Sequence, residues 1–440
     1  MSSLYAKLID VIERQITPMA GAIGQQKYVT SIRDGFITAL PFMIVGSFLL
    51  VFIFPPFSPD TTWGFARAWL QFSLDHRDAL MLPFNFSMGV MTLFIAVGIA
   101  ASLAKHHHLD SLTAGMLSLM SFLLVAAPLK DGQISTAYFS GQGIFTAILV
   151  AIYSTELYAF LKRHNITIRL PPEVPAGVAR SFEILIPVLA IILTLHPLNL
   201  FIEAQLGMII PEAIMSLVKP LVAASDTLPA ILLSVLVCQV LWFAGIHGAA
   251  IVSGMLQMFW LTNLGMNQQA LAQGAPLPHI FMEAFWTFFI VVGGSGATMG
   301  LVFCYLRSRS AHLRSIGRLS VVPSLFNINE PVIFGTPIVM NPVFFIPFLL
   351  APMVNAVLAW AAMKLDLIGR VISVVPWTAP APIGGAWALG WDFRAAILVI
   401  VLACVSAIIY FPFFKVYEKQ LLAQEAEEAE RAEQESQQTA

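Results

Sequence analysis

The sequence predicts an all-α polytopic membrane protein, with about ten transmembrane helices plus re-entrant hairpins and interfacial amphipathic helices. Three observations support this prediction: 58% of the 440 residues are hydrophobic, only 11% are charged, and long uncharged windows recur along the chain. Soluble domains carry about 25% charged residues, so this composition offers few water-facing surfaces. Lipid is therefore the expected solvent for most of the chain.

Windows without Asp, Glu, Lys or Arg mark the candidate spans, because about 20 apolar residues cross a bilayer as a helix. The clear windows are Gly35–Ile53, Phe84–Ala104, Ser111–Leu129, Ile184–Ile202, Thr227–Ile246, Ala284–Leu306, Val343–Met363 and Ala395–Phe414. Two further windows are plausible, namely Gly141–Leu161, which tolerates Glu156, and the shorter Gly248–Asn263. Most Lys and Arg residues then fall in segments on one side, which predicts that both termini are cytoplasmic.

The order of these windows divides the chain into two transmembrane halves and three polar segments. An amphipathic N-terminus carries Asp10 and Glu13, which favours an interfacial helix over a signal peptide. The C-terminal end is rich in Ala, Glu and Gln and is expected to be a solvated helix or disordered. The expected units are 1–30 (N-terminal segment), 31–203 (scaffold half), 204–226 (amphipathic linker), 227–416 (substrate half) and 417–440 (acidic tail).

The second half is interrupted by Gly- and Pro-rich motifs, which predict where a site lies. Irregular backbone survives at membrane depth only when it is buried in protein or lines a wet cavity. Transporters build their substrate sites from such discontinuous helices. The motifs are GIHG (245–248), GGSGAT (293–298), NINEPVIFGTP (327–337) and PWTAPAPIGG (376–385).

Glu330 is the strongest candidate site residue. Pro331 and Pro337 prevent a continuous helix here, so Glu330, Asn327 and Asn329 are expected to face a polar cavity. A charge at the bilayer centre costs at least ~2.5–3.5 kcal/mol, and such residues are usually functional. The alternative places Glu330 at the membrane edge, where it is solvated or paired with a nearby arginine of the 314–318 segment.

His247, Trp242 and Trp377 are the next candidates. His247 lies between Gly245 and Gly248, and glycine permits close backbone approach to a ligand. A packed neutral histidine is an equal alternative, and both tryptophans could be interfacial anchors. Trp242 could also be a stacking platform. The set Glu330, Asn329, His247 and Trp377 matches a carbohydrate site, where aromatic faces meet the sugar ring and carboxylates and amides meet its hydroxyls.

Other features of the sequence indicate a functional site less strongly. Glu283 is expected to have a structural role, and the run His106–His108 is expected to be a solvated loop rather than a metal site. Metalloprotease, P-loop and Rossmann patterns are absent, so no metal, no cofactor and no ATP hydrolysis are expected. The net charge of −2 argues against a nucleic-acid partner.

At these motifs the sequence resembles the enzyme IIC membrane components of the bacterial phosphoenolpyruvate-dependent sugar phosphotransferase system (PTS). The resemblance runs from about residue 5 to 415 and is nearest to the lactose/cellobiose/diacetylchitobiose branch. The motifs that carry it are IRDGFITALPFMIVGS (32–47), LPPEVPAGVARSF (170–182), WFAGIHG (242–248), GGSGAT (293–298), NEPVIFGTPIVMNP (329–342) and VPWTAPAPIGG (375–385).

The resemblance implies an inner-membrane homodimer that imports a β-linked disaccharide and presents its 6-hydroxyl to a phosphocysteine on soluble enzyme IIB. IIA, HPr and enzyme I would act upstream, on separate chains, which leaves open whether the chain itself counts as an enzyme. Glu330 matches the family glutamate that contacts this hydroxyl, with Asn329 beside it. His247 and Trp377 match sugar ligands. The resemblance leaves the particular sugar open.

A rival hypothesis keeps the membrane fold but changes the mechanism. An ion-coupled secondary sugar transporter could use Glu330 and His247 as a proton relay. The two hypotheses differ in the state of the cargo, because a phosphotransferase delivers sugar phosphate and a secondary transporter delivers free sugar.

Overall fold

The structure of the chain, a computed structural model, describes residues 22, 25–55, 57, 60–130, 132–168, 171, 182–336, 338, 339 and 341–438. Within these residues the fold consists of packed helices and one small antiparallel hairpin, formed by β1 (Leu129–Lys130) and β2 (Gln133–Ile134). Most of the expected N-terminal segment 1–30 and of the motif at 170–182 lies outside the described residues.

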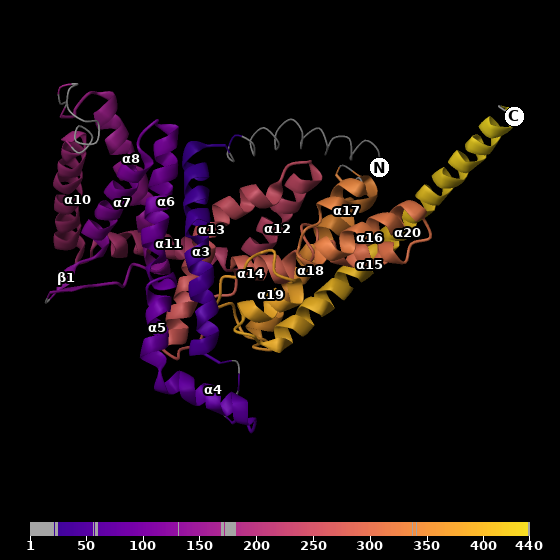
Figure 1. Cartoon of the computed structure of the whole chain (residues 1–440), viewed down its shortest axis with the longest axis horizontal. Helices are drawn as coiled ribbons and strands as arrows, with labels where there is room; N and C mark the ends of the chain where they lie inside the picture. The colour runs from indigo at the N-terminus through magenta and orange to yellow at the C-terminus, as the bar shows by residue number, and fades with distance from the viewer. Residues whose placement is uncertain are drawn as a thin grey trace.

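The first half of the chain, drawn from indigo to magenta in Figure 1, forms a bundle in which α3, α6, α7, α8 and α10 run roughly parallel, whereas α4 lies across one end. Glycines allow close contact within it, since a Cβ added to Gly35 would lie 2.3 Å from Cγ1 of Ile99. The elements are α3 (Lys27–Ile53), α4 (Gly64–Asp75), α5 (Arg77–Asn85), η2 (Met88–Val90), α6 (Met91–His106), α7 (Ser111–Ala126), η3 (Gly141–Gly143), α8 (Ile144–Arg163), α10 (Leu185–Leu206) and α11 (Ile210–Ser225).

The second half lies beside this bundle and combines shorter, interrupted helices with three long ones, α13, α18 and α20 (Figure 1). The acidic C-terminal segment continues α20 as a helix to Gln438, and this end of α20 projects beyond the other helices. The elements are α12 (Leu228–Phe243), α13 (Gly248–Ala272), α14 (Glu283–Phe285), η4 (Trp286–Ile290), α15 (Met299–Leu306), α16 (Ala311–Leu325), α17 (Glu330–Gly335), α18 (Pro342–Lys364), α19 (Ala381–Ala388) and α20 (Phe393–Gln438).

Seven helical stretches of the described chain are long and apolar enough to cross a membrane. An eighth is obtained if α11 and α12, which are bent by 74° at their junction, count as one broken span. The expected total of ten stays a prediction. The stretches are Lys27–Leu50, Met88–His106, Gly141–Arg163, Leu185–Leu206, Gly248–Ala272, Pro342–Lys364 and Phe393–Glu427.

Two expected spans differ from the observed helices. The window Gly248–Asn263 is part of a longer helix, because α13 continues to Ala272. The window Ala284–Leu306 is not one helix: η4 ends at Ile290 and α15 begins at Met299. The GGSGAT motif lies in the gap, and three of its residues, Gly293, Gly294 and Gly296, have φ between 80° and 103°. These left-handed conformations favour glycine and end a right-handed helix.

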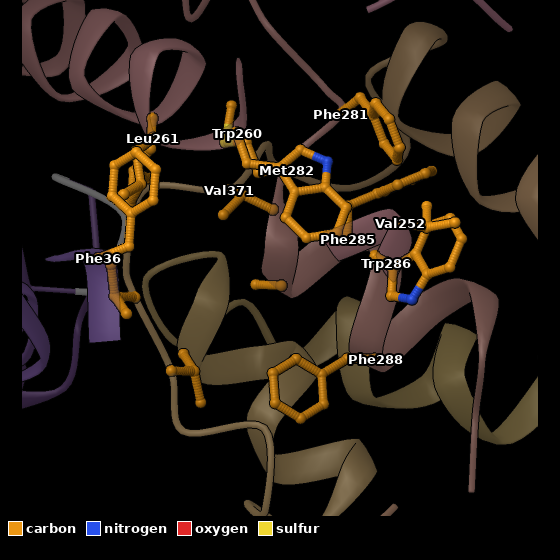
Figure 2. Packing of buried hydrophobic residues seen from close by; sticks show 14 of the residues in the cluster. Phe36, Val252, Trp260, Leu261, Phe281, Met282, Phe285, Trp286, Phe288 and Val371 are labelled. Carbon is orange, nitrogen blue, oxygen red and sulfur yellow. The ribbon is translucent and has the colours of Figure 1, made fainter. Parts of the chain in front are cut away.

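An aromatic cluster packs α13 against the segment that begins at Phe281 (Figure 2). The ring centroid of Trp260 lies 5.7 Å from that of Phe281 and 5.9 Å from that of Trp286. On the other side of α13, Leu261 lies near Phe36 of α3, which belongs to the first half. This apolar core therefore joins the two halves and forms one wall of the site described below.

A polar cluster fastens the start of α3 to α6 and α8. Oε1 of Glu156 accepts hydrogen bonds from Nζ of Lys27 at 2.7 Å and from the Tyr28 hydroxyl at 2.9 Å, and it lies 2.9 Å from Nε2 of His107. The expectation of a solvated loop is therefore wrong for the central histidine, whose side chain is only 9% exposed. Among the described residues, no three His, Cys, Asp or Glu side chains could hold a metal ion together.

Candidate functional site

A cavity of about 280 Å³ lies where the interrupted segments of the second half meet. Each of the four Gly- and Pro-rich motifs contributes at least one lining residue, although the motifs are far apart in the sequence. The cavity is lined by Trp242, His247, Ala249, Ala250, Ser253, Trp260, Glu283, Trp286, Thr287, Val291, Gly294, Ser295, Asn327, Asn329, Glu330 and Trp377. Polar and aromatic groups thus converge in a space suited to a small polar molecule.

Glu330 begins α17 and lines the cavity with an exposed side chain. Pro331 follows at the second helical position, where the missing N–H of proline is tolerated. Within the described residues, the Glu330 carboxylate has neither a hydrogen-bond partner nor an ion-pair partner. The alternative pairing with Arg314 is not formed, since that guanidinium donates to the Ser308 carbonyl at 2.8 and 3.0 Å. The carboxylate is available to a ligand.

Asn329 lies beside Glu330, but most of its hydrogen-bonding capacity is used by the protein. Its Nδ2 donates to the Ser295 carbonyl at 2.6 Å and to Oγ1 of Thr298 at 2.9 Å, and the residue is 4% exposed. A Cβ added to Gly294 would lie 2.3 Å from Cγ of Asn329, so only glycine permits this contact. Oδ1 is the atom of Asn329 that is left for a ligand.

Asn327 joins three of the four interrupted motifs. Its Oδ1 accepts a hydrogen bond from the Gly293 N–H at 3.1 Å, and its Nδ2 donates to the carbonyls of Trp377 at 2.9 Å and Ala379 at 3.2 Å. Its φ of 60° is left-handed, a conformation that asparagine tolerates better than most residues. The sequence placed Asn327 at the cavity, whereas the structure adds that it holds the cavity walls together.

His247 caps the start of α13 and faces the cavity next to Trp242. Its Nδ1 accepts a hydrogen bond from the Ala250 N–H at 3.1 Å, so the neutral imidazole carries its proton on Nε2. The centroids of the His247 and Trp242 rings are 4.5 Å apart. Nε2–H of His247 has no hydrogen-bond partner among the described residues and is left for a ligand oxygen.

Gly245 does not line the cavity, so it has a different role from the close approach to a ligand that was expected. It follows the end of α12 with φ of 79°. Its N–H donates to the Trp242 carbonyl, and the N–H of Ile246 donates to the Leu241 carbonyl at 2.9 Å. This glycine-dependent pattern is the Schellman helix end, and it turns the chain so that His247 reaches the site.

Trp377 also lines the cavity, and this residue is 53% exposed. Its backbone carbonyl is held by Asn327, which fixes the segment relative to Glu330. An exposed aromatic face at a polar cavity suits stacking against a ring-shaped ligand.

Glu283 also lines the cavity, although the sequence predicted only a structural role for it; Trp260, Trp286, Ser253 and Thr287 are further lining residues that were not predicted. Its Oε2 accepts a hydrogen bond from Nε2 of Gln257 at 3.0 Å, and the indoles of Trp260 and Trp286 line the same cavity. The signal that could have found it is the one that marked Glu330, namely a carboxylate in an uncharged stretch just before interrupted backbone. The cavity is therefore lined by two carboxylates: Glu283 is bound by an amide, and Glu330 has no partner in the part of the chain that the structure describes.

The cavity and the helices around it define a class of protein, a helical membrane transporter whose site is built from discontinuous helices. The family model described as "Phosphotransferase system, EIIC" matches residues 33–352. The chain therefore belongs to the EIIC family of the phosphotransferase system and is a multi-pass membrane protein.

Individual relatives agree with this assignment along nearly the whole chain. The chain is 37% identical to the "PTS system cellobiose-specific EIIC component" of Geobacillus stearothermophilus, covering 95% of this chain and 96% of the relative. It is 33% identical to the "PTS system lactose-specific EIICB component" of Lactococcus lactis subsp. lactis, covering 95% of this chain and 74% of the relative. The crystal structure of the diacetylchitobiose transporter ChbC aligns with a TM-score of 0.86 and 34% identity, covering 94% of this chain and 99% of ChbC.

Proposed function

We propose that this EIIC chain imports a β-linked disaccharide of the cellobiose, diacetylchitobiose or lactose class and presents its 6-hydroxyl for phosphorylation. The substrates named for the relatives support this class, and so does a cavity that combines carboxylates, an imidazole and several indoles. The observation that carries the proposal is the Glu330 carboxylate, which lines the cavity and has no partner among the described residues.

Glu330 orients the 6-hydroxyl and accepts its proton. The hydroxyl oxygen attacks the phosphorus of a phosphocysteine on enzyme IIB, the S–P bond breaks, and the cysteine thiolate leaves. Phosphoryl transfer depends mostly on in-line positioning and charge stabilisation, so a strong base is unnecessary. The charged product cannot return through an apolar barrier, which makes transport one-way.

The remaining lining residues bind the sugar before transfer. Nε2–H of His247 donates to a sugar oxygen, and the Glu283 carboxylate and Oδ1 of Asn329 accept from hydroxyls. The indoles of Trp377 and Trp242 pack against the apolar face of the ring. These contacts are distributed around the cavity, so losing one weakens binding without abolishing the site.

Enzyme IIB would approach the turn between α15 and α16, where Arg307 and Arg309 are exposed, together with the exposed Arg318 of α16. Basic side chains there suit a phosphorylated partner arriving from the cytoplasm. We further propose that both termini are cytoplasmic in the bacterial inner membrane, that IIA, HPr and enzyme I supply the phosphoryl group, and that the first half forms a homodimer interface.

The test uses membrane vesicles containing the chain, phosphoenolpyruvate, enzyme I, HPr and the IIA and IIB proteins of a cellobiose system. Labelled cellobiose, diacetylchitobiose, lactose and maltose are offered separately, and maltose is the α-linked control. We expect the 6-phosphate of at least one β-disaccharide and none of maltose. Free sugar that accumulates only with an ion gradient, and no sugar phosphate with any partner set, would instead support the secondary transporter.

A further inference from the structure

The turn that leads into α16 is held by carboxylates of a distant part of the chain. Oε1 of Glu418, on α20, accepts hydrogen bonds from the Ser308 hydroxyl and from the Arg309 N–H, both at 2.7 Å. Oε2 of the same carboxylate accepts from Nζ of Lys415 at 2.7 Å. The Glu418 side chain is only 4% exposed, so this carboxylate is enclosed by its donors.

A second carboxylate lies two turns further along α20. Oε1 of Glu425 accepts from the Ser310 hydroxyl at 2.6 Å and from the His312 N–H at 3.3 Å. Ser310 is also the N-cap of α16, since its Oγ accepts from the Leu313 N–H at 3.4 Å. The donors at the start of α16 are therefore satisfied partly by α20, in addition to the local cap.

The far end of α16 leads directly into the site. α16 ends at Leu325, and the next residues include Asn327, which binds two other walls of the cavity, and Glu330. α20 also contacts the site from another side, because the Tyr410 hydroxyl donates to the Gly296 carbonyl at 2.7 Å. Figure 1 shows α20 running along the second half, beside α15 and α16.

We propose that Glu418 and Glu425 are positioning residues for phosphoryl transfer, because they fix the start of α16 on α20 and thereby set the position of Glu330 at its other end. This inference rests on the proposed function of Glu330. α16 has 15 residues and is about 22 Å long, so a small tilt at its start displaces its far end by ~1 Å. A displacement of that size at a reacting group can cost about 100-fold in rate.

The test compares full-length variants in lipid nanodiscs with phosphorylated IIB and the β-disaccharide that the vesicle assay identifies, or cellobiose if none is identified. The variants are Glu418→Gln and Glu425→Gln. The control is Glu427→Gln, which makes the same change on the same helix at an exposed residue without a partner among the described residues. We expect kcat to fall about 10-fold in both variants. The sugar Kd should stay within about twofold of wild type and Tm within a few degrees. The control should match wild type in all three quantities.

Either of two results would overturn the proposal: a wild-type kcat in both variants, or parallel losses of kcat, sugar affinity and Tm, which would indicate a purely structural role. Ser308→Ala provides a second check, because it removes one of the three hydrogen-bond donors to Glu418. The kcat loss in the double variant should be smaller than the product of the two single losses, whereas a fully additive loss in free energy would contradict a shared contact.

A readout that needs no partner separates this proposal from the proposed function. Amide hydrogen exchange of 308–330 should be faster in Glu418→Gln than in wild type or Glu427→Gln, and the increase should include 326–330. Unchanged exchange at 326–330 would overturn the positioning role. If the wild-type chain phosphorylates no sugar while this exchange difference is present, the proposed function fails and the mechanical link between α20 and the site stands.

Discussion

Replacing Asn327 with alanine tests whether one side chain holds the cavity walls together. The amide makes three hydrogen bonds, one to the 291–298 turn and two to the Trp377–Ala379 segment. Each contributes about 1 kcal/mol net. Alanine at a φ of 60° adds roughly 1 kcal/mol of backbone strain. The arrangement of segments that forms the cavity should therefore be destabilised by about 4 kcal/mol in Asn327→Ala.

That loss sets an upper limit of about 1000-fold on the change in sugar affinity, because each 1.4 kcal/mol corresponds to a factor of ten. Neighbouring contacts, such as those of Asn329, keep part of the arrangement in place. We therefore expect the Kd for the transported sugar to rise by about 10- to 100-fold. Asn327→Gly removes the same hydrogen bonds without the strain, so it should be about 1 kcal/mol less damaging than Asn327→Ala.

The assay is isothermal titration of the purified chain in nanodiscs, with Tm measured in parallel. Asn341→Ala is the matched control, since Asn341 caps α18 through the Val343 N–H at 3.0 Å and does not line the cavity. The control should retain its sugar affinity and lose about 1 kcal/mol of stability. Wild-type sugar affinity in Asn327→Ala would refute the idea that this side chain assembles the site.

Three further substitutions test the roles assigned to lining residues. Glu330→Gln should bind sugar within a few-fold of wild type but lose at least about 100-fold in phosphorylation rate; phosphorylation at the normal rate would remove it from the chemistry. His247→Ala should raise the sugar Kd about 10-fold through loss of the Nε2–H donor, and an unchanged Kd would leave it as a helix cap. Glu283→Gln retains a partner for Gln257 but replaces one acceptor oxygen with an NH2 donor, so the sugar Kd should rise about 10-fold while kcat is retained; a lower kcat with an unchanged Kd would instead indicate a role in the chemistry.

Much of the candidate site could be predicted from the sequence, because charge and backbone breaks are conspicuous in an apolar chain. A carboxylate, two prolines and two asparagines in an uncharged region predict a polar cavity around Glu330, since irregular backbone at membrane depth must face protein or water. The same reasoning located His247 and Trp377. This reasoning did not assign Glu283 to the cavity, because a single carboxylate next to a helical window is equally consistent with a structural hydrogen bond.

The sequence by itself determined that the chain is a helical membrane protein, because its uncharged segments have the roughly 20-residue length of a membrane-spanning helix, which satisfies its own backbone within lipid. It also determined where those helices are interrupted, since Gly and Pro act on their own backbone.

Only the tertiary structure decided which interruptions meet and which side chains are left for a ligand. Asn327 and Asn329 are alike in sequence, yet Asn327 binds two other motifs and Asn329 binds the 291–298 turn, whereas Glu330 keeps its carboxylate without a partner among the described residues. Likewise, the pairing of Glu418 with Ser308 spans 110 residues. Such pairings depend on how distant helices pack, and local sequence pattern carries no record of that packing.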